Sequence, residues 1–269
     1  MRFMSQYESL EDLENKITTF DGVEHNFDEI IEKMHDDDFY YGYLGKQALS
    51  SSSLKAILHS PKKYLQMLEG QDSESQALRD GKLFHWSLLE PDVFENVKVV
   101  ESSTRTTKVF KEALAEFGEA YIPKEIEKAI VLSEVIRKNE EANSYLQDAE
   151  FEVPMIKMVH GVPFRAKADI IKGDLIVDLK TTSDLKKFKW SAYNFSYDLQ
   201  AYLYLQMFPQ AKSFGFLCID KNTHDLAYFE CSPDFLESGK EKLERGIQQY
   251  KYFFQEDNDV EQHMEKGML

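Results

Sequence analysis

Two short segments in the middle of the chain carry charged side chains in alternation. The first contains Arg165, Lys167 and Asp169, and the second contains Asp178 and Lys180. Side chains alternate across a β-strand, so each set would share one face of its strand. Asp178 follows Asp169 by nine positions through a predicted tight turn. The spacing therefore predicts a hairpin that brings the two carboxylates together.

A pair of carboxylates suits metal-dependent chemistry. At a separation of about 4 Å they repel by about 4 kcal/mol at an effective dielectric constant of about 20. A hard divalent ion such as Mg²⁺, with Mn²⁺ as a substitute, would relieve this repulsion and still coordinate phosphate oxygens and water. Lys180 could orient the attacking water or stabilise charge in the transition state. The plain alternative is a surface hairpin, because 30% of the chain is charged.

The surrounding pattern predicts an α-rich first half followed by strands. Helices are expected in a hairpin that begins at the serines of 50–53 and restarts at Pro61, and then over Gln76–Leu89, Lys108–Phe117 and Pro123–Leu146. Strands are expected over Phe151–Val159, Val162–Ile171, Leu175–Leu179, Phe214–Ile219 and Leu226–Glu230. Further helices are expected over Trp190–Phe208 and Pro233–Phe254.

Three regions are predicted along the chain. Residues 1–45 would form an acidic, aromatic and weakly structured arm with a short helix, residues 46–254 the main domain, and residues 255–269 an acidic tail. The chain holds 48 acidic and 32 basic residues, a net charge of −16, which disfavours nonspecific adhesion to nucleic acid or membranes. With no long apolar run and no secretion signal, we expect a soluble cytoplasmic protein. The two cysteines are expected to be unreactive free thiols.

Four motifs occur in a fixed order. They are Gly81-x-x-x-His85, then Asp169, then Asp178-x-Lys180-Thr181-Thr182, then Gln200-x-x-x-Tyr204. In this order and structural context the chain, over residues 46–254, resembles the RecB-like branch of the PD-(D/E)xK nuclease superfamily, and within it the RecE-type (exonuclease VIII) recombination exonucleases of phages and prophages. The resemblance implies an α/β (α+β) fold with a mixed central sheet flanked by helices.

The resemblance also implies roles for individual residues. His85, Asp169, Asp178 and the carbonyl of Leu179 would bind the metal, and Lys180 would be the catalytic lysine. Gln200 and Tyr204 would complete the catalytic set by supporting the site or contacting DNA.

Several assignments have ordinary alternatives. His85 could be a core histidine, Tyr204 a core aromatic, and Glu152 either a further carboxylate at the metal or an exposed residue at a strand end. Gly81 is unusual within a helix and is expected to allow close approach to the sheet. Arg165, Lys167 and Arg79 are the expected phosphate contacts.

Taken with the resemblance, the prediction is a Mg²⁺-dependent exonuclease that digests linear double-stranded DNA from 5′ to 3′. The product would be a 3′ single strand for a RecT-type annealing protein, and the enzyme would form a ring-shaped homo-oligomer in the cytoplasm of a bacterial host. Two alternatives stay open: a single-strand or flap endonuclease with the same site, and a non-catalytic acidic protein that mimics DNA.

Overall fold

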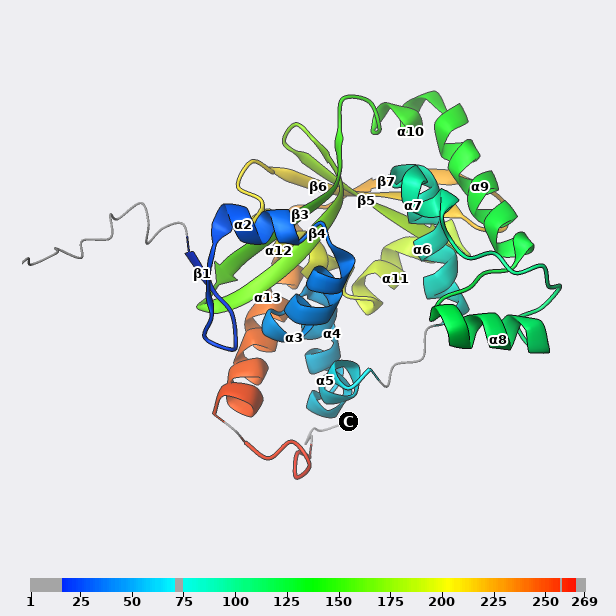
Figure 1. The fold of residues 1–269 in the computed structure, drawn as a ribbon. Coiled ribbons are helices and arrows are strands. Elements are labelled where there is room, and N and C mark those ends of the chain that lie inside the picture. Colours follow the sequence, from blue (N-terminus) through cyan, green and yellow to red (C-terminus); the bar gives the residue numbers. More distant parts are fainter. Residues whose placement is uncertain (1–15, 71–74, 257, 265–269) are drawn as a thin grey trace, which may run out of the picture.

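A five-stranded mixed sheet forms the centre of the fold (Figure 1). The structure is a computed structural model, and it describes residues 16–70, 75–256 and 258–264. The strands are β3 (Glu150–Val159), β4 (Val162–Lys172), β5 (Leu175–Thr182), β6 (Ser213–Asp220) and β7 (Leu226–Glu230). They lie in the order β3-β4-β5-β6-β7, and β5 and β6 are parallel whereas all other neighbours are antiparallel. The predicted mixed α/β architecture is confirmed.

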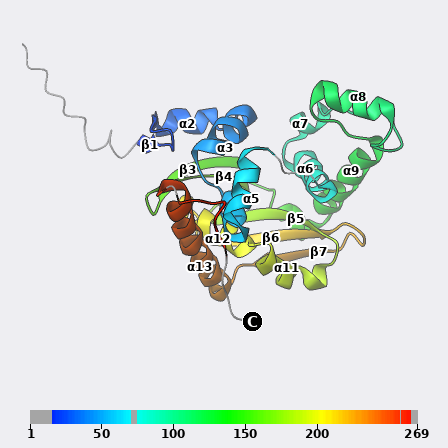
Figure 2. The same cartoon turned by 90° about the horizontal axis from the view of Figure 1, so that it is seen from below.

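Helices cover both faces of this sheet (Figure 2). One face packs against α4 (Ser51–His59), α12 (Tyr197–Met207) and α13 (Pro233–Tyr250). The other packs against α6 (Gln76–Leu89), α9 (Pro123–Lys138) and α10 (Glu140–Ser144). Phe214 and Phe216 point into the first core, and Leu217 and Ile219 into the second. Because both faces of β6 are covered, this strand is apolar along nearly its whole length.

Further helices and helical turns complete this part of the fold. They are α5 (Pro61–Leu68), α7 (Pro91–Glu95), α8 (Lys108–Phe117), α11 (Phe188–Asn194), the 3-10 turn η2 (Leu185–Lys187) and the π-helical turn η3 (Lys251–Gln255). Among the described residues, no helix is long and apolar enough to cross a membrane. Cys218 and Cys231 are both free thiols, as expected.

The described part of the N-terminal region is more ordered than the sequence suggests. It forms β1 (Lys16–Thr18), β2 (Glu24–Asn26), α2 (Phe27–Lys33), the π-helical turn η1 (Asp38–Tyr43) and α3 (Leu44–Gln47). Ile30, Met34 and Leu44 are buried together against Ile156 of β3. The expected short helix is present, but residues 16–45 are not weakly structured, because they pack against the outer strand; residues 1–15 lie outside the described residues.

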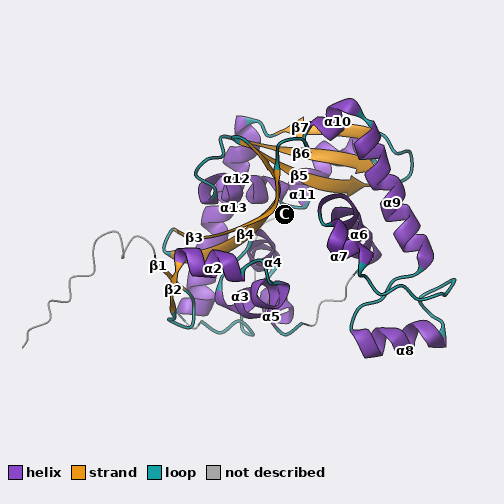
Figure 3. Ribbon diagram, turned by 45° about the horizontal axis from the view of Figure 1, so that its top comes forward, coloured by secondary structure: helices purple, strands orange, loops and turns teal. Residues whose placement is uncertain are grey.

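The sheet opens in its middle. Pairing of β4 with β5 is confined to residues 170–172 and 175–177. Further along, β4 bonds instead to the segment before α4, where the Leu49 N–H donates to Pro163 O at 2.9 Å and Arg165 N–H donates to Leu49 O at 2.8 Å. Figure 3 shows β3 and β4 curving away from β5, β6 and β7. Asp169 and Asp178 lie just beyond the last paired residues, where the two strands separate.

Two predicted helices are interrupted. The helix expected over 190–208 consists of α11 and α12, and Ser196 between them has φ of 55°. The helix expected over 123–146 stops at Asn139, whose side chain accepts the Ala142 N–H and starts α10. Helical periodicity continues through both breaks, which is why it does not reveal them.

Close packing of α12 and α13 depends on a glycine. A Cβ at Gly239 in α13 would collide with the backbone carbonyl oxygen of Asp198 in α12. We therefore expect Gly239→Ala to lower the free energy of unfolding by about 1–3 kcal/mol. In thermal unfolding, the Tm should fall by about 2–4 °C for each kcal/mol lost. Gly81→Ala in α6 is the matched control, because no atom lies within 4 Å of its added Cβ and alanine favours a helix. An unchanged Tm for Gly239→Ala would contradict the packing argument.

Candidate active site

Three side chains that could hold a metal ion meet where β4 and β5 separate. Each of His85, Glu152 and Asp169 offers one ligand atom, and these atoms lie within 4.8 Å of one another. They come from α6, β3 and β4 respectively. The chain thus brings together an imidazole nitrogen and two carboxylates from segments far apart in sequence.

Backbone and side-chain contacts orient this group. The Asp169 Oδ2 accepts the Leu179 N–H at 2.8 Å, which ties the carboxylate to β5. His85 Nδ1 lies 3.5 Å from the same oxygen, and its Nε2 lies 3.1 Å from the carbonyl oxygen of Leu179. Three of the four predicted ligands, His85, Asp169 and the Leu179 carbonyl, therefore lie together, whereas the fourth, Asp178, contacts Lys180 and Gln200. His85 does not lie wholly in the core, because 26% of its side chain is exposed.

Glu152 joins the group through an unusual backbone. The register of β3 with β4 pairs Phe151 with Ile170 and Val153 with Ala168, which places Glu152 opposite Asp169. Glu152 has φ of 49°, a left-handed conformation that non-glycine residues rarely adopt, and strain of this kind clusters at functional sites. From the sequence, Glu152 could be either a metal ligand or an exposed residue at a strand end. The structure places it in the donor group.

Burial and repulsion by neighbouring carboxylates raise the pKa values of the two carboxylates. Burial and then the charge of Asp169 raise the pKa of Glu152 to about 9. Burial raises the pKa of Asp169 to about 6, with the His85 charge lowering it and Asp178 raising it further. The ionised form of this pair is therefore costly until a positive charge lies between its members.

Asp178 and Lys180 form an ion pair beside the donor group. Lys180 Nζ lies 2.5 Å from Asp178 Oδ2, and the Gln200 side-chain amide donates to Asp178 Oδ1 at 2.6 Å. Burial lowers the pKa of Lys180, but Asp178 and Tyr197 outweigh it and hold the pKa above its usual range. Lys180 is thus a fixed ammonium, and both Asp178 oxygens face protein partners rather than the other donors.

Gln200 and Tyr204 occupy supporting positions. They lie one turn apart on α12, as the spacing predicts. Gln200 reaches Asp178, whereas the Tyr204 hydroxyl donates to the backbone carbonyl of Lys167 at 3.0 Å. Gln200 thus contacts a charged side chain of β5, and Tyr204 contacts the backbone of β4.

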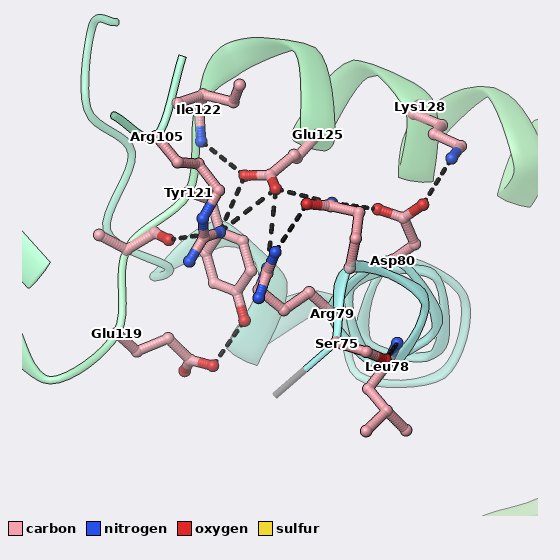
Figure 4. Close-up of polar contacts among 12 residues, drawn as sticks. Ser75, Leu78, Arg79, Asp80, Arg105, Glu119, Tyr121, Ile122, Glu125 and Lys128 are labelled. Carbon is pink, nitrogen blue, oxygen red and sulfur yellow. Dashed lines mark hydrogen bonds and ion pairs between the residues drawn. The ribbon is translucent and has the colours of Figure 1, made fainter. Parts of the chain in front are cut away.

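The three predicted phosphate contacts lie in different places. Lys167 and the donor group line one cleft, and the Lys167 Nζ lies 3.1 Å from Asp37 Oδ1. Arg165 lies over the ring of Tyr40 at 4.5 Å and lines a neighbouring cavity. Arg79 is not brought to either, because its guanidinium points toward Glu125 of α9 and donates to Gln76 at 2.7 Å (Figure 4).

The cleft itself has a volume of about 970 Å³. His85, Glu152, Asp169 and Lys180 line it, and Gly81 lines the α6 side. The expectation that Gly81 allows close approach to the sheet is wrong, since no atom lies within 4 Å of a Cβ built there. Its missing side chain instead keeps the cleft open one turn before His85.

A family model matches this region. The model describes a PDDEXK-like domain of unknown function (DUF3799), and it matches residues 50–263. The chain belongs to this family. The match includes every residue of the donor group and the lysine beside it. No curated protein matches the chain significantly.

One solved structure shares the overall fold of this chain. The crystal structure of a candidate exonuclease from Eubacterium rectale is similar with a TM-score of 0.67 at 16% sequence identity, covering 87% of this chain and 95% of that one. A phage-related exonuclease from Haemophilus somnus 129PT matches at 15% identity over 78% of this chain and 96% of that one, with a TM-score of only 0.34. At this identity the first match supports the fold alone.

The donor set of this PDDEXK-like domain fits a divalent ion. His85, Glu152, Asp169 and the Leu179 carbonyl supply one nitrogen and several oxygen ligands, which suits Mg²⁺ or Mn²⁺. Burial and repulsion by neighbouring carboxylates raise the pKa values of Glu152 and Asp169, and the positive charges of Lys167 and His85 offset this only in part. A bound cation would favour the ionised form of both groups.

The first consequence is stabilisation by metal. At 100 times its dissociation constant, Mg²⁺ is expected to add about 2.7 kcal/mol, a rise in Tm of several degrees in thermal unfolding. Asp169→Asn should remove most of this shift, because it removes a charged ligand. Asp174→Asn, in the exposed turn before β5, should retain it. A wild-type Tm that does not respond to saturating Mg²⁺ or Mn²⁺ would exclude the site.

The second consequence concerns pH in the metal-free protein. The folded pKa of Glu152, about 9, lies above the value of 4.5 for a free glutamate, so the folded state binds more protons between these values and loses stability as pH rises. Glu152→Gln should therefore raise the Tm in EDTA at pH 8, by about 2–4 °C for each kcal/mol gained in the free energy of unfolding. The rise in Tm should be smaller near pH 5. The exposed Glu150→Gln should not. A lower Tm for Glu152→Gln at pH 8 would contradict the charge argument.

Proposed function

We propose that the protein is a divalent-metal-dependent nuclease that hydrolyses phosphodiester bonds of DNA. The observation that carries this proposal is the placement of a half-buried lysine, ion-paired with Asp178, beside an imidazole and two carboxylates in one open cleft. An ordinary surface hairpin would leave the lysine and the acids solvated. Here Lys180 and Asp178 keep only 17% and 3% of their side chains exposed.

Each residue has a task that its contacts support. His85, Glu152 and Asp169 would hold the ion, which when bound would polarise a phosphodiester oxygen and acidify a coordinated water. Lys180 would stabilise negative charge on the phosphate, because Asp178 keeps it protonated and in place. Gln200 would position Asp178, and Tyr204 would fix β4 just before Asp169.

The finer activity follows from the RecE-type resemblance. We propose digestion of linear double-stranded DNA from 5′ to 3′, leaving a 3′ single strand for a RecT-type annealing protein in the cytoplasm of a bacterial host. We also propose a homo-oligomeric ring, because a basic inner channel would reconcile DNA binding with a net charge of −16. Mg²⁺ is the proposed ion, with Mn²⁺ as a substitute.

The decisive experiment is digestion of end-labelled linear duplex DNA. Wild-type protein with Mg²⁺ is expected to shorten the duplex from one end, and EDTA should stop the reaction. Lys180→Ala and the similarly sized Lys180→Met should lower the rate by about 100-fold or more, as expected for loss of a preorganised charge in a transition state. The exposed Lys212→Ala is the matched control and should retain activity.

The substrate form distinguishes the alternatives. An exonuclease spares covalently closed circular duplex, whereas a flap or single-strand endonuclease cuts branched or single-stranded DNA without needing a duplex end. Activity that survives in Lys180→Met would reject the assigned role of that lysine. No activity on linear, circular or single-stranded DNA with Mg²⁺ or Mn²⁺ would reject the nuclease.

A further inference from the structure

A second cavity adjoins the cleft, and its charged lining is cationic, whereas acids and lysines both line the cleft. Its volume is about 630 Å³, and it shares Lys55, Lys180 and Tyr197 with the cleft. Four cationic side chains line it: Lys46, Lys55, Arg165 and Lys180. Among the described residues that line it there is no carboxylate, although the whole chain has 48 acidic residues against 32 basic ones. Such a cavity favours a strongly anionic ligand.

Arg165 is the central cation of this cavity. It is 8% exposed, and its buried Nε has no hydrogen-bond partner. Buried polar groups normally have partners, so a buried guanidinium with an unpaired N–H, in a side chain that lines the cavity, favours an anion beside it. Gly45 also lines the cavity, and a Cβ there would lie 3.8 Å from Arg165 Nη2, so the missing side chain leaves space beside the guanidinium.

The start of α4 faces the same cavity. Ser50, Ser51 and Ser52 line it, and Ser50 caps the helix by accepting the Ser53 N–H at 3.2 Å. The N–H groups in the first turn of a helix lack partners within the helix and attract anions. Arg165 is anchored next to this turn, because its backbone N–H donates to Leu49 O. The helix end and the guanidinium therefore converge.

Lys55 supports the same conclusion. Burial and then the positive charge of Lys180 lower the pKa of its ammonium group. Two ammonium groups that repel each other across a cavity gain from an anion between them.

We propose that this cavity binds the terminal phosphate monoester of a DNA strand, which carries nearly two negative charges where an internal phosphodiester carries one. The proposal rests on the proposed nuclease function. Lys180 lies at the boundary of both spaces, so a strand that presents a phosphodiester to the cleft would place its terminal phosphate in the cavity. The cavity is larger than one phosphate, and Tyr40 and Phe195 offer aromatic walls for the terminal nucleoside.

The test measures binding in EDTA, so that no cleavage occurs. Three fluorescent duplexes of one sequence, with hydroxyl ends, 5′-phosphates or 3′-phosphates, are compared by anisotropy. We expect one phosphorylated form to bind about tenfold more tightly than the hydroxyl form, the change expected from one added charge-assisted contact. Inorganic phosphate should compete with that form and reduce its advantage.

Two variants and a control locate the effect. Arg165→Gln should bring the ratio of affinities close to one, and the exposed Lys46→Ala should lower it without threatening the fold. Lys33→Ala, at the end of α2 and outside the cavity, should keep the wild-type ratio. A ratio unchanged in both Arg165→Gln and Lys46→Ala would place any preference elsewhere and overturn the proposal.

The remaining outcomes are equally distinct. Equal affinity for all three duplexes would overturn the proposal, as would binding of inorganic phosphate with no preference for a phosphorylated end. The experiment measures binding and not cleavage, so it tests the two proposals separately. A protein that prefers a phosphorylated end but never cleaves DNA would contradict the proposed nuclease function and support the phosphate site.

Discussion

The separation of β4 from β5 is the constraint on which the site depends. If the two strands paired along their full length, Asp169 would be one member of a regular ladder and the Leu179 N–H would bond to backbone. Instead pairing is confined to residues 170–172 and 175–177, and Asp169 accepts the freed Leu179 N–H. The same separation leaves the β4 edge open to Leu49, which sets the start of α4 beside Arg165. One break in the sheet thus creates both the donor group and the adjoining cationic cavity.

Helix α6 provides the third side of the donor group, and its position depends on a polar network as well as on packing. Phe84 and Leu88 fix the helix against the sheet, while Asp80 pairs with Lys128 of α9 at 2.5 Å. Glu125 is 7% exposed and accepts Ile122 N–H, Gln76 and Arg105 (Figure 4). A buried carboxylate with this many donors is costly to displace, so the network holds the α6 axis and with it His85.

Local sequence predicted much of this arrangement, and its failures have identifiable physical causes. Periodicity and caps located α6 and the β3–β4–β5 meander, and the motif order singled out His85, Asp169 and Lys180. The left-handed backbone at Glu152 and the break at Ser196 arise from contacts between segments distant in sequence, which local patterns do not record. The order of residues 16–45 was not predicted for a related reason. Their acidic and aromatic composition is typical of a weakly structured arm, but Ile30 and Met34 become buried only because β3 is present.

The distribution of charge would allow the proposed binding of DNA by an acidic chain. Glu152 and Asp169 line the cleft, and Lys46 and Arg165 line the cavity beside it. Lys180 lies between them, paired with Asp178 yet lining both. In the proposed nuclease, attraction for a phosphate backbone would therefore be local, concentrated where these two spaces meet. A net charge of −16 then opposes nonspecific contact along the duplex and leaves binding to depend on fit within the two spaces.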